Sequence, residues 1–163
     1  MTDSPKNAGR LLRFRSQEDP SVEPDAAVIA AAPFTPNLRL GALLWSVPGA
    51  GGGSPRRIGT ATACARITDP AFTPDARFDF HVRFDLPEGP VTATGGCTLI
   101  SNDLPVRGIV LAACHLRVVE GPAGCLGGAA ASLSIFNPGQ VPGFSTGSYW
   151  TLQLYEEERT DGV

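Results

Sequence analysis

One histidine of the sequence stands where it could act on a bound molecule. His115 lies within the apolar segment 110–116, and a neutral imidazole in that setting could donate a hydrogen bond to a bound carbonyl group. A half-buried histidine with a structural partner would fit the same pattern, so both interpretations stay open. The second histidine, His81, stands between Asp79 and Arg83 on the polar side of an alternating segment and is expected at the surface.

The four cysteines show no metal-binding spacing. Cys64, Cys97, Cys114 and Cys125 include no Cys-x-x-Cys pair, and a zinc site built with only two histidines would need an unusual arrangement. Each cysteine stands in an apolar or small-residue strand pattern, which predicts reduced, buried thiols. The sequence therefore predicts no metal site.

Motifs of nucleophilic, phosphate-binding and acid–base catalysis are missing. The sequence contains no Gly-x-Ser-x-Gly, His-Glu-x-x-His, P-loop or dinucleotide-binding fingerprint. The glycine-rich run 49–54 lacks the lysine of a phosphate loop and is expected to form a flexible hairpin loop. The carboxylates occur at the termini, in turns and on the polar face of 77–86, which argues against a glycosidase pair. No cofactor is predicted.

Segment 77–86 carries the clearest structural signal. Every second residue from Phe78 to Leu86 is apolar and every residue between is polar or charged, which is typical of a strand with one buried face. The connections between successive predicted strands are too short for a helical crossover, which needs about a dozen residues. Strands that follow one another in the sequence are therefore expected to pair antiparallel. Because closure removes exposed edges, the pattern predicts an all-β fold, an eight-stranded antiparallel up-and-down barrel. The seven other predicted strands are 26–32, 38–47, 57–67, 91–100, 108–120, 126–136 and 148–157.

The predicted barrel interior combines small and aromatic residues. Small-residue runs at 60–65, 92–96 and 127–132 favour a cavity for one apolar small molecule, although tight sheet packing would use the same residues. The aromatic residues suit binding, or chemistry that depends on shaping a flexible apolar substrate; alternatively they are simply the core. Those at predicted lining positions are Trp45, Phe78, Phe80, Phe84, Phe136 and Trp150.

The segment before the predicted barrel has an amphipathic character. Leu11, Leu12 and Phe14 would each gain about 1.5–3 kcal/mol on burial, which is a large gain to forgo in a tail. Residues 10–17 are therefore expected to form a short helix that lies as a lid across one barrel mouth. The alternative is a solvated, mobile terminus.

Length and composition fit one domain. The 163 residues are 42% hydrophobic and 18% charged, with a net charge of −3, so neither nucleic acid nor an anionic membrane is expected as a partner. The first residues lack the apolar core of a secretory signal, which predicts a soluble, cytoplasmic protein. We expect an N-terminal extension or lid at 1–25, the barrel at 26–157 and a C-terminal tail at 158–163.

Three segments carry a resemblance to a known family, namely 58–64, 91–96 and 120–129. Their order, with a glycine-punctuated hairpin between the sixth and seventh strands, resembles the allene-oxide-cyclase/dirigent-type barrel. Among small bacterial members, the chain is most similar to the spirotetronate and spirotetramate [4+2] cyclases (Diels–Alderases). The resemblance covers roughly residues 26–157 and rests on glycine and strand spacing. It departs from plant dirigent proteins because no secretory signal is present.

The resemblance implies a cofactor-independent cyclase that joins a diene to an alkene within a linear, polyketide-derived tetramate or tetronate polyene. Folding the apolar polyene would supply the catalysis, because well-oriented intramolecular reactions recover about 7–11 kcal/mol. On this hypothesis His115 or Gln153 donates a hydrogen bond to the substrate carbonyl, and Leu11, Leu12 and Phe14 close the mouth. The residues that would line the pocket are Trp45, Thr60, Phe80, Phe84, Phe136, Trp150 and Leu152.

The family also suggests a homodimer through an outer barrel face. Two other functions stay open. One is a non-catalytic carrier of an apolar metabolite, and the other is a different cyclase or isomerase on the same barrel.

Overall fold

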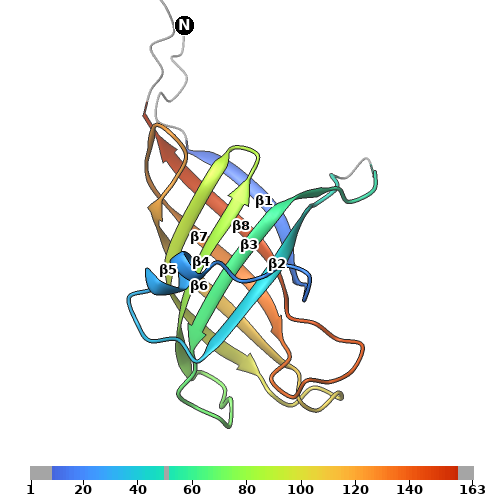
Figure 1. Cartoon of the computed structure of the whole chain (residues 1–163). Coiled ribbons are helices and arrows are strands. Elements are labelled where there is room, and N and C mark those ends of the chain that lie inside the picture. The colour runs from blue at the N-terminus through green and yellow to red at the C-terminus, as the bar shows by residue number, and fades with distance from the viewer. Residues whose placement is uncertain (1–8, 50–51, 158–163) are drawn as a thin grey trace, which may run out of the picture.

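The computed structural model describes residues 9–49 and 52–157, which form a closed antiparallel β-barrel (Figure 1). Each strand pairs with the next one along the chain, and the last strand closes the ring against the first. The predicted all-β, eight-stranded up-and-down barrel is therefore confirmed. The strands are β1 (Arg10–Glu18), β2 (Leu38–Ser46), β3 (Arg57–Arg66), β4 (Arg77–Leu86), β5 (Gly89–Ser101), β6 (Val110–Glu120), β7 (Cys125–Phe136) and β8 (Gly147–Glu156).

Strand β4 shows how the alternating sequence builds the barrel wall. Its apolar side chains, from Phe78 to Leu86, point into the lumen and are at most 8% exposed. Phe80 lies between two small cross-strand partners, Ala65 on β3 and Gly95 on β5. Because large and small side chains alternate around the ring, they interdigitate within a narrow lumen.

Segment 10–17, expected as a lid helix, is instead most of the first strand of the barrel. Phe14 is only 1% exposed, and Leu12 and Ser16 share its inward side, whereas Leu11 points outward and is 53% exposed. The spacing of these inward residues is two, which fits a strand. A strand between β2 and β8 also satisfies its backbone groups on both edges, whereas a helix this short is marginal by itself. The lid prediction is therefore wrong for this segment.

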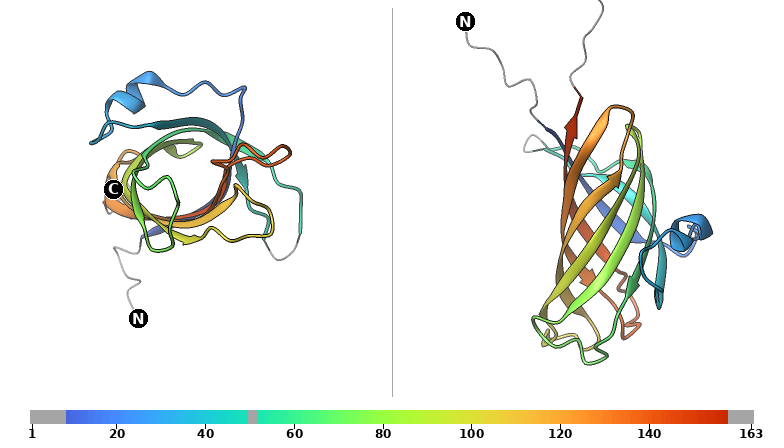
Figure 2. Two further views of the ribbon diagram at one scale, coloured as in Figure 1. Left: turned by 90° about the horizontal axis from the view of Figure 1, so that it is seen from below. Right: turned by 90° about the vertical axis from the view of Figure 1, so that its left-hand side faces the viewer.

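Segment 26–32, expected as a strand, contains the short helix α1 (Ala26–Ala30). The Asp25 carboxylate caps it by accepting from the backbone N–H of Ala27 at 2.9 Å, and its alanines favour a helix. The helix lies on the outside of the wall, over β3 and β4, and buries Val28 there (Figure 2). The barrel consequently begins at Arg10 rather than at residue 26.

Parts of the expected organisation lie outside the described residues. These are residues 1–8 of the predicted extension and the predicted tail 158–163. Within 9–49 and 52–157, no helix is long and apolar enough to cross a membrane.

Six aromatic side chains share the lumen: Phe14, Phe78, Phe80, Phe84, Phe136 and Trp150. The ring centroid of Phe84 lies 4.9 Å from that of Phe14 and 4.9 Å from that of Trp150, both in edge-to-face contact. Phe78 and Phe136 form another edge-to-face pair, 5.6 Å apart. These rings pack against one another across the barrel, so they form its core.

The small-residue runs bring neighbouring strands close together. A Cβ atom on Gly95 would lie 2.4 Å from the backbone oxygen of His115, and one on Gly128 would lie 2.2 Å from that of Gln153. Only glycine permits such an approach of two strands. The structure therefore favours the tight-packing interpretation of these runs over an open cavity.

Candidate functional site

The predicted site residues divide between the two sides of the barrel wall. The structure brings together most of the predicted apolar pocket, but it separates that pocket from both predicted hydrogen-bond donors. The residues that face the lumen are Leu12, Phe14, Phe80, Phe84, Phe136, Trp150 and Leu152. The residues that face outward are Leu11, Trp45, Thr60, His115 and Gln153.

His115 and Gln153 lie on the outside because of strand parity. His115 stands between Cys114 and Leu116, which point inward and are 0% and 4% exposed. Gln153 follows the fully buried Leu152 and is itself exposed. Successive residues of a strand face opposite sides of the sheet, so neither donor can reach a carbonyl in the lumen. The prediction of that contact is wrong.

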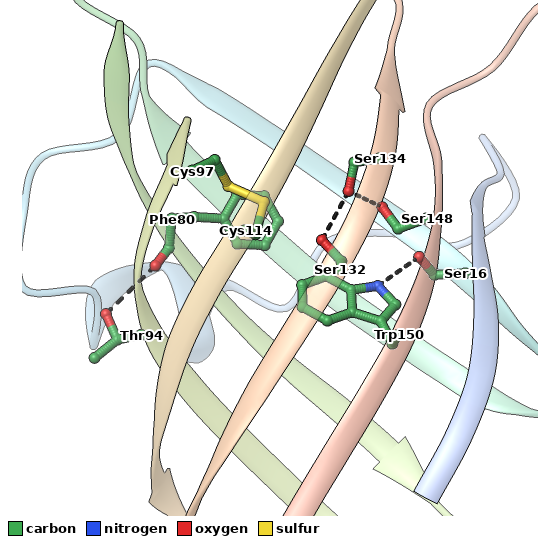
Figure 3. Close-up of a disulfide and its surroundings, with 9 residues drawn as sticks. All are labelled: Ser16, Phe80, Thr94, Cys97, Cys114, Ser132, Ser134, Ser148 and Trp150. Carbon is green, nitrogen blue, oxygen red and sulfur yellow. Dashed lines mark hydrogen bonds between the residues drawn. A yellow bond between two sulfur atoms is a disulfide. The ribbon is translucent and has the colours of Figure 1, made fainter. Parts of the chain in front are cut away.

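The polar groups inside the lumen are serine hydroxyls that the sequence analysis did not single out (Figure 3). Ser134 Oγ lies 2.9 Å from Ser132 Oγ and 2.6 Å from Ser148 Oγ, so the three hydroxyls form a hydrogen-bonded chain. Trp150 donates from its indole Nε1 to Ser16 Oγ at 3.0 Å. We refer to these four serines as the serine cluster and take it as the candidate site.

Strand β7 inverts the ordinary distribution of polar and apolar residues at this point. Ser132 and Ser134 point inward and are 5% and 4% exposed, whereas Leu133 and Ile135 point outward and are 67% and 44% exposed. A count with period two back from the buried Phe136 would place both serines in the lumen. That signal was present in the sequence, but it competes with the expectation that apolar residues face inward.

The serine cluster has unused hydrogen-bonding capacity. Three hydroxyls joined by two hydrogen bonds use two of their three protons, so one donor remains for a further acceptor. Ser16 accepts from Trp150, and its own proton has no acceptor in the part of the chain that the structure describes. The cluster can therefore donate to a carbonyl oxygen.

The remainder of the lumen is apolar. Between the two rims, the described residues that face inward include no Asp, Glu, Lys, Arg or His side chain. General acid–base catalysis requires such a group at the reacting atoms, so these residues offer positioning and hydroxyl donation instead.

A disulfide bond joins Cys97 of β5 to Cys114 of β6 on the luminal side of the wall (Figure 3). The two residues are direct cross-strand partners, and Ser132 is the partner of Cys114 on its other side. The prediction of reduced thiols is wrong for this pair, because strand register cannot be read from a spacing of 17 residues. Cys64 and Cys125 are free thiols, and burial raises the pKa of Cys64.

His81 lies beneath α1 and not at the surface as expected. It is 3% exposed, and its cross-strand neighbour Cys64 is 1% exposed, because the helix covers this part of the outer wall. Burial lowers the pKa of His81, while the nearby backbone of Val28 opposes that shift. Neither ring nitrogen has a hydrogen-bond partner among the described residues. The imidazole ring thus packs under the helix.

In residues 9–49 and 52–157, no group of three or more His, Cys, Asp or Glu side chains is placed to hold a metal ion. No protein-family model, curated protein or solved structure matches the chain. The resemblance to allene-oxide-cyclase/dirigent-type barrels stays a prediction.

Proposed function

We propose that the barrel lumen binds an apolar small molecule with a carbonyl group, and that the chain is a cofactor-independent cyclase. The reaction would be an intramolecular [4+2] cycloaddition on a linear, polyketide-derived tetramate or tetronate polyene. The observation that supports this proposal is the serine cluster, which offers hydroxyl donors within an otherwise apolar wall. A cycloaddition transfers no proton, so it needs no acid or base at the reacting atoms.

In this mechanism the serine cluster takes over the role that the sequence suggested for His115 and Gln153. The unused hydroxyl proton donates to the substrate carbonyl, which polarises the conjugated alkene and stabilises charge that develops in the transition state. The aromatic wall, with Phe84 and Trp150 at its centre, holds the polyene in a folded pose. Positioning of this kind accounts for about 7–11 kcal/mol in favourable intramolecular reactions.

Substrate binding requires the luminal aromatic side chains to move apart. The centroids of Phe80 and Trp150 are 6.1 Å apart, and the indole is fixed by its hydrogen bond to Ser16. A polyene between these rings would displace the indole and change its surroundings. Since the other tryptophan, Trp45, is on the outer side of the wall, Trp45→Phe leaves Trp150 as the only fluorescent indole.

The test is incubation of the purified chain with a linear tetramate- or tetronate-capped polyene, followed by mass-resolved chromatography. Conversion to a product of unchanged mass, with loss of diene absorbance, supports the cyclase. Ser148→Ala should lower the rate about tenfold or more, because it removes a carbonyl-binding donor, whereas Ser54→Ala at an exposed loop position is the matched control.

Other outcomes separate the alternatives. Trp150 fluorescence that changes in a saturable way, without any product, would identify a carrier of apolar molecules. A product formed by another ring closure or isomerisation would keep the lumen as the site but replace the reaction. The absence of both product formation and binding would refute the proposal.

We also propose that the activity is cytoplasmic. Disulfides are uncommon in that compartment, so the Cys97–Cys114 bond is the feature that tests this part of the proposal. Cell fractionation with rapid alkylation should recover the chain in the cytoplasmic fraction with the bond retained, because both sulfurs are buried. Recovery of the chain outside that fraction would overturn this part of the proposal.

A further inference from the structure

His115 belongs to a polar hollow on the outer wall, beside the C-terminal side of α1. A row of cross-strand partners runs from Arg66 through Asp79 and Gly96 to His115. Two adjoining hollows of about 450 and 650 Å³ share Arg66, Asp79, Gly95 and His115. We refer to both together as the arginine hollow.

Gly96 forms part of the floor of this hollow, and Arg77 covers it. A Cβ atom on Gly96 would lie 3.6 Å from a terminal guanidinium nitrogen of Arg77 and 3.2 Å from the backbone oxygen of Phe78. The guanidinium of Arg77 therefore lies above the bare Cα of Gly96. From the opposite side, Arg117 of β6 lines the first hollow together with His115.

The charges of the hollow do not balance. Arg66 forms an ion pair with Asp79, and its guanidinium carbon lies 5.7 Å from the ring centroid of Phe34, which restrains it further. Neither Arg77 nor Arg117 has an ion-pair partner among the described residues. Three arginines and one carboxylate thus line the arginine hollow, on a chain whose net charge is −3.

We propose that the arginine hollow binds the phosphate group of a small molecule. Guanidinium groups form paired, charge-assisted hydrogen bonds with phosphate oxygens, and Arg77 and Arg117 can approach a tetrahedral anion from two sides. The His115 imidazole supplies a further donor, and the missing side chain of Gly96 leaves room for the Arg77 guanidinium beside the anion. This site is on the opposite side of the wall from the serine cluster, so it stands independently of the proposed cyclase.

The two histidines provide a direct assay. His81 is buried under α1 and His115 is exposed, so the two imidazole rings give separable nitrogen and proton signals in nuclear magnetic resonance. Inorganic phosphate is titrated at constant pH and ionic strength. Saturable shifts of the His115 signals, with those of His81 unchanged, are the expected result.

Variants then locate the site. Arg77→Ala and Arg117→Ala should each raise the phosphate concentration at half-saturation about tenfold, because each removes a charged pair of donors. Arg56→Ala, at an exposed position outside the hollow, is the matched control and should leave the titration unchanged. Non-saturable shifts, or equal titrations for all three variants, would overturn the proposal.

A second probe distinguishes the source of the phosphate. Phenyl phosphate carries an aromatic ring that can contact Pro33 and Phe34 at the edge of the hollow. Tighter binding of phenyl phosphate than of inorganic phosphate supports a phosphorylated organic molecule as the ligand. Equal binding supports the free anion.

Discussion

Ser134 is the central member of the luminal hydroxyl chain, and its replacement by alanine tests how the serine cluster is held together. Ser134→Ala removes the hydrogen bonds of 2.9 Å to Ser132 and 2.6 Å to Ser148 at one step. It also leaves two hydroxyls without their partner in a site that is 5–7% exposed. The cost should therefore exceed that of removing a hydroxyl at the end of the chain.

The size of the effect follows from the number of bonds. Each hydrogen bond contributes about 0.5–1.5 kcal/mol net, so Ser134→Ala should lower the free energy of unfolding by about 2 kcal/mol and Ser132→Ala by about 1 kcal/mol. For a domain of this length, 2 kcal/mol corresponds to roughly 4–8 °C in Tm. Replacing Ser132, Ser134 and Ser148 together should cost less than Ser134→Ala alone, because no buried hydroxyl then lacks its partner.

Urea unfolding of the Trp45→Phe background, followed by the fluorescence of Trp150, measures these differences in one cooperative transition. The indole is bonded to Ser16, outside the three-serine chain, so its signal reports unfolding in every variant. Double-mutant cycles between Ser132 and Ser148 supply the coupling energy. A Ser134→Ala cost below about 0.5 kcal/mol, or a triple variant that costs the sum of the single ones, would refute the hydrogen-bonded chain.

Three further predictions address the fold. Phe14→Ala should lower the free energy of unfolding by about 3–5 kcal/mol, because Phe14 is buried in the strand that closes the barrel. Leu11→Ala, on the outer side of the same strand, should change it by at most about 0.5 kcal/mol. Equal effects of the two variants in thermal unfolding would indicate that β1 is peripheral to the barrel. Replacing Cys97 and Cys114 by alanine should cost about 3 kcal/mol, and mass spectrometry of the oxidised, unfolded chain should count two free thiols, whereas four would contradict the bond. Because the pKa of His81 is lowered in the folded chain, the unfolded chain binds a proton at this residue first as the pH falls. The Tm should therefore decrease below about pH 6.5, and His81→Gln should remove that decrease. A pH profile of Tm that is the same for both proteins would contradict burial of the ring.

Strand content and antiparallel order were predictable because they depend on local patterns. The alternation in 77–86 and the short links fix the strands and their pairing, and the structure agrees at seven of the eight predicted strands. Segment 26–32 was not predictable in this way, because five residues of Ala, Val and Ile fit a strand or a capped helix equally well. Asp25 was the available sign of the helix, since its carboxylate is the N-cap.

The candidate site was less predictable, because it depends on which side of each strand faces inward. For β4 the parity is evident from five alternating apolar residues, so Phe80 and Phe84 were placed correctly. For β6 and β7 both sides carry apolar residues, and a shift by one residue exchanges the lumen with the outside. His115 was assigned to the lumen for this reason, while Ser132 was considered only as part of the small-residue run 127–132 and Ser134 was not considered.

The inverted pattern of β7 connects the luminal site with the outer wall. A strand that directs Ser132 and Ser134 inward must direct Leu133 and Ile135 outward, so hydroxyls in the lumen and an apolar outer face arise from the same four residues. A monomer would gain stability from the opposite parity, since two exposed branched side chains would each gain about 1.5–3 kcal/mol on burial. The observed parity is therefore costly for the isolated barrel. The proposed function would account for this cost on the inner side of β7, because a carbonyl-bearing molecule in the lumen needs the hydroxyl donors that this parity provides.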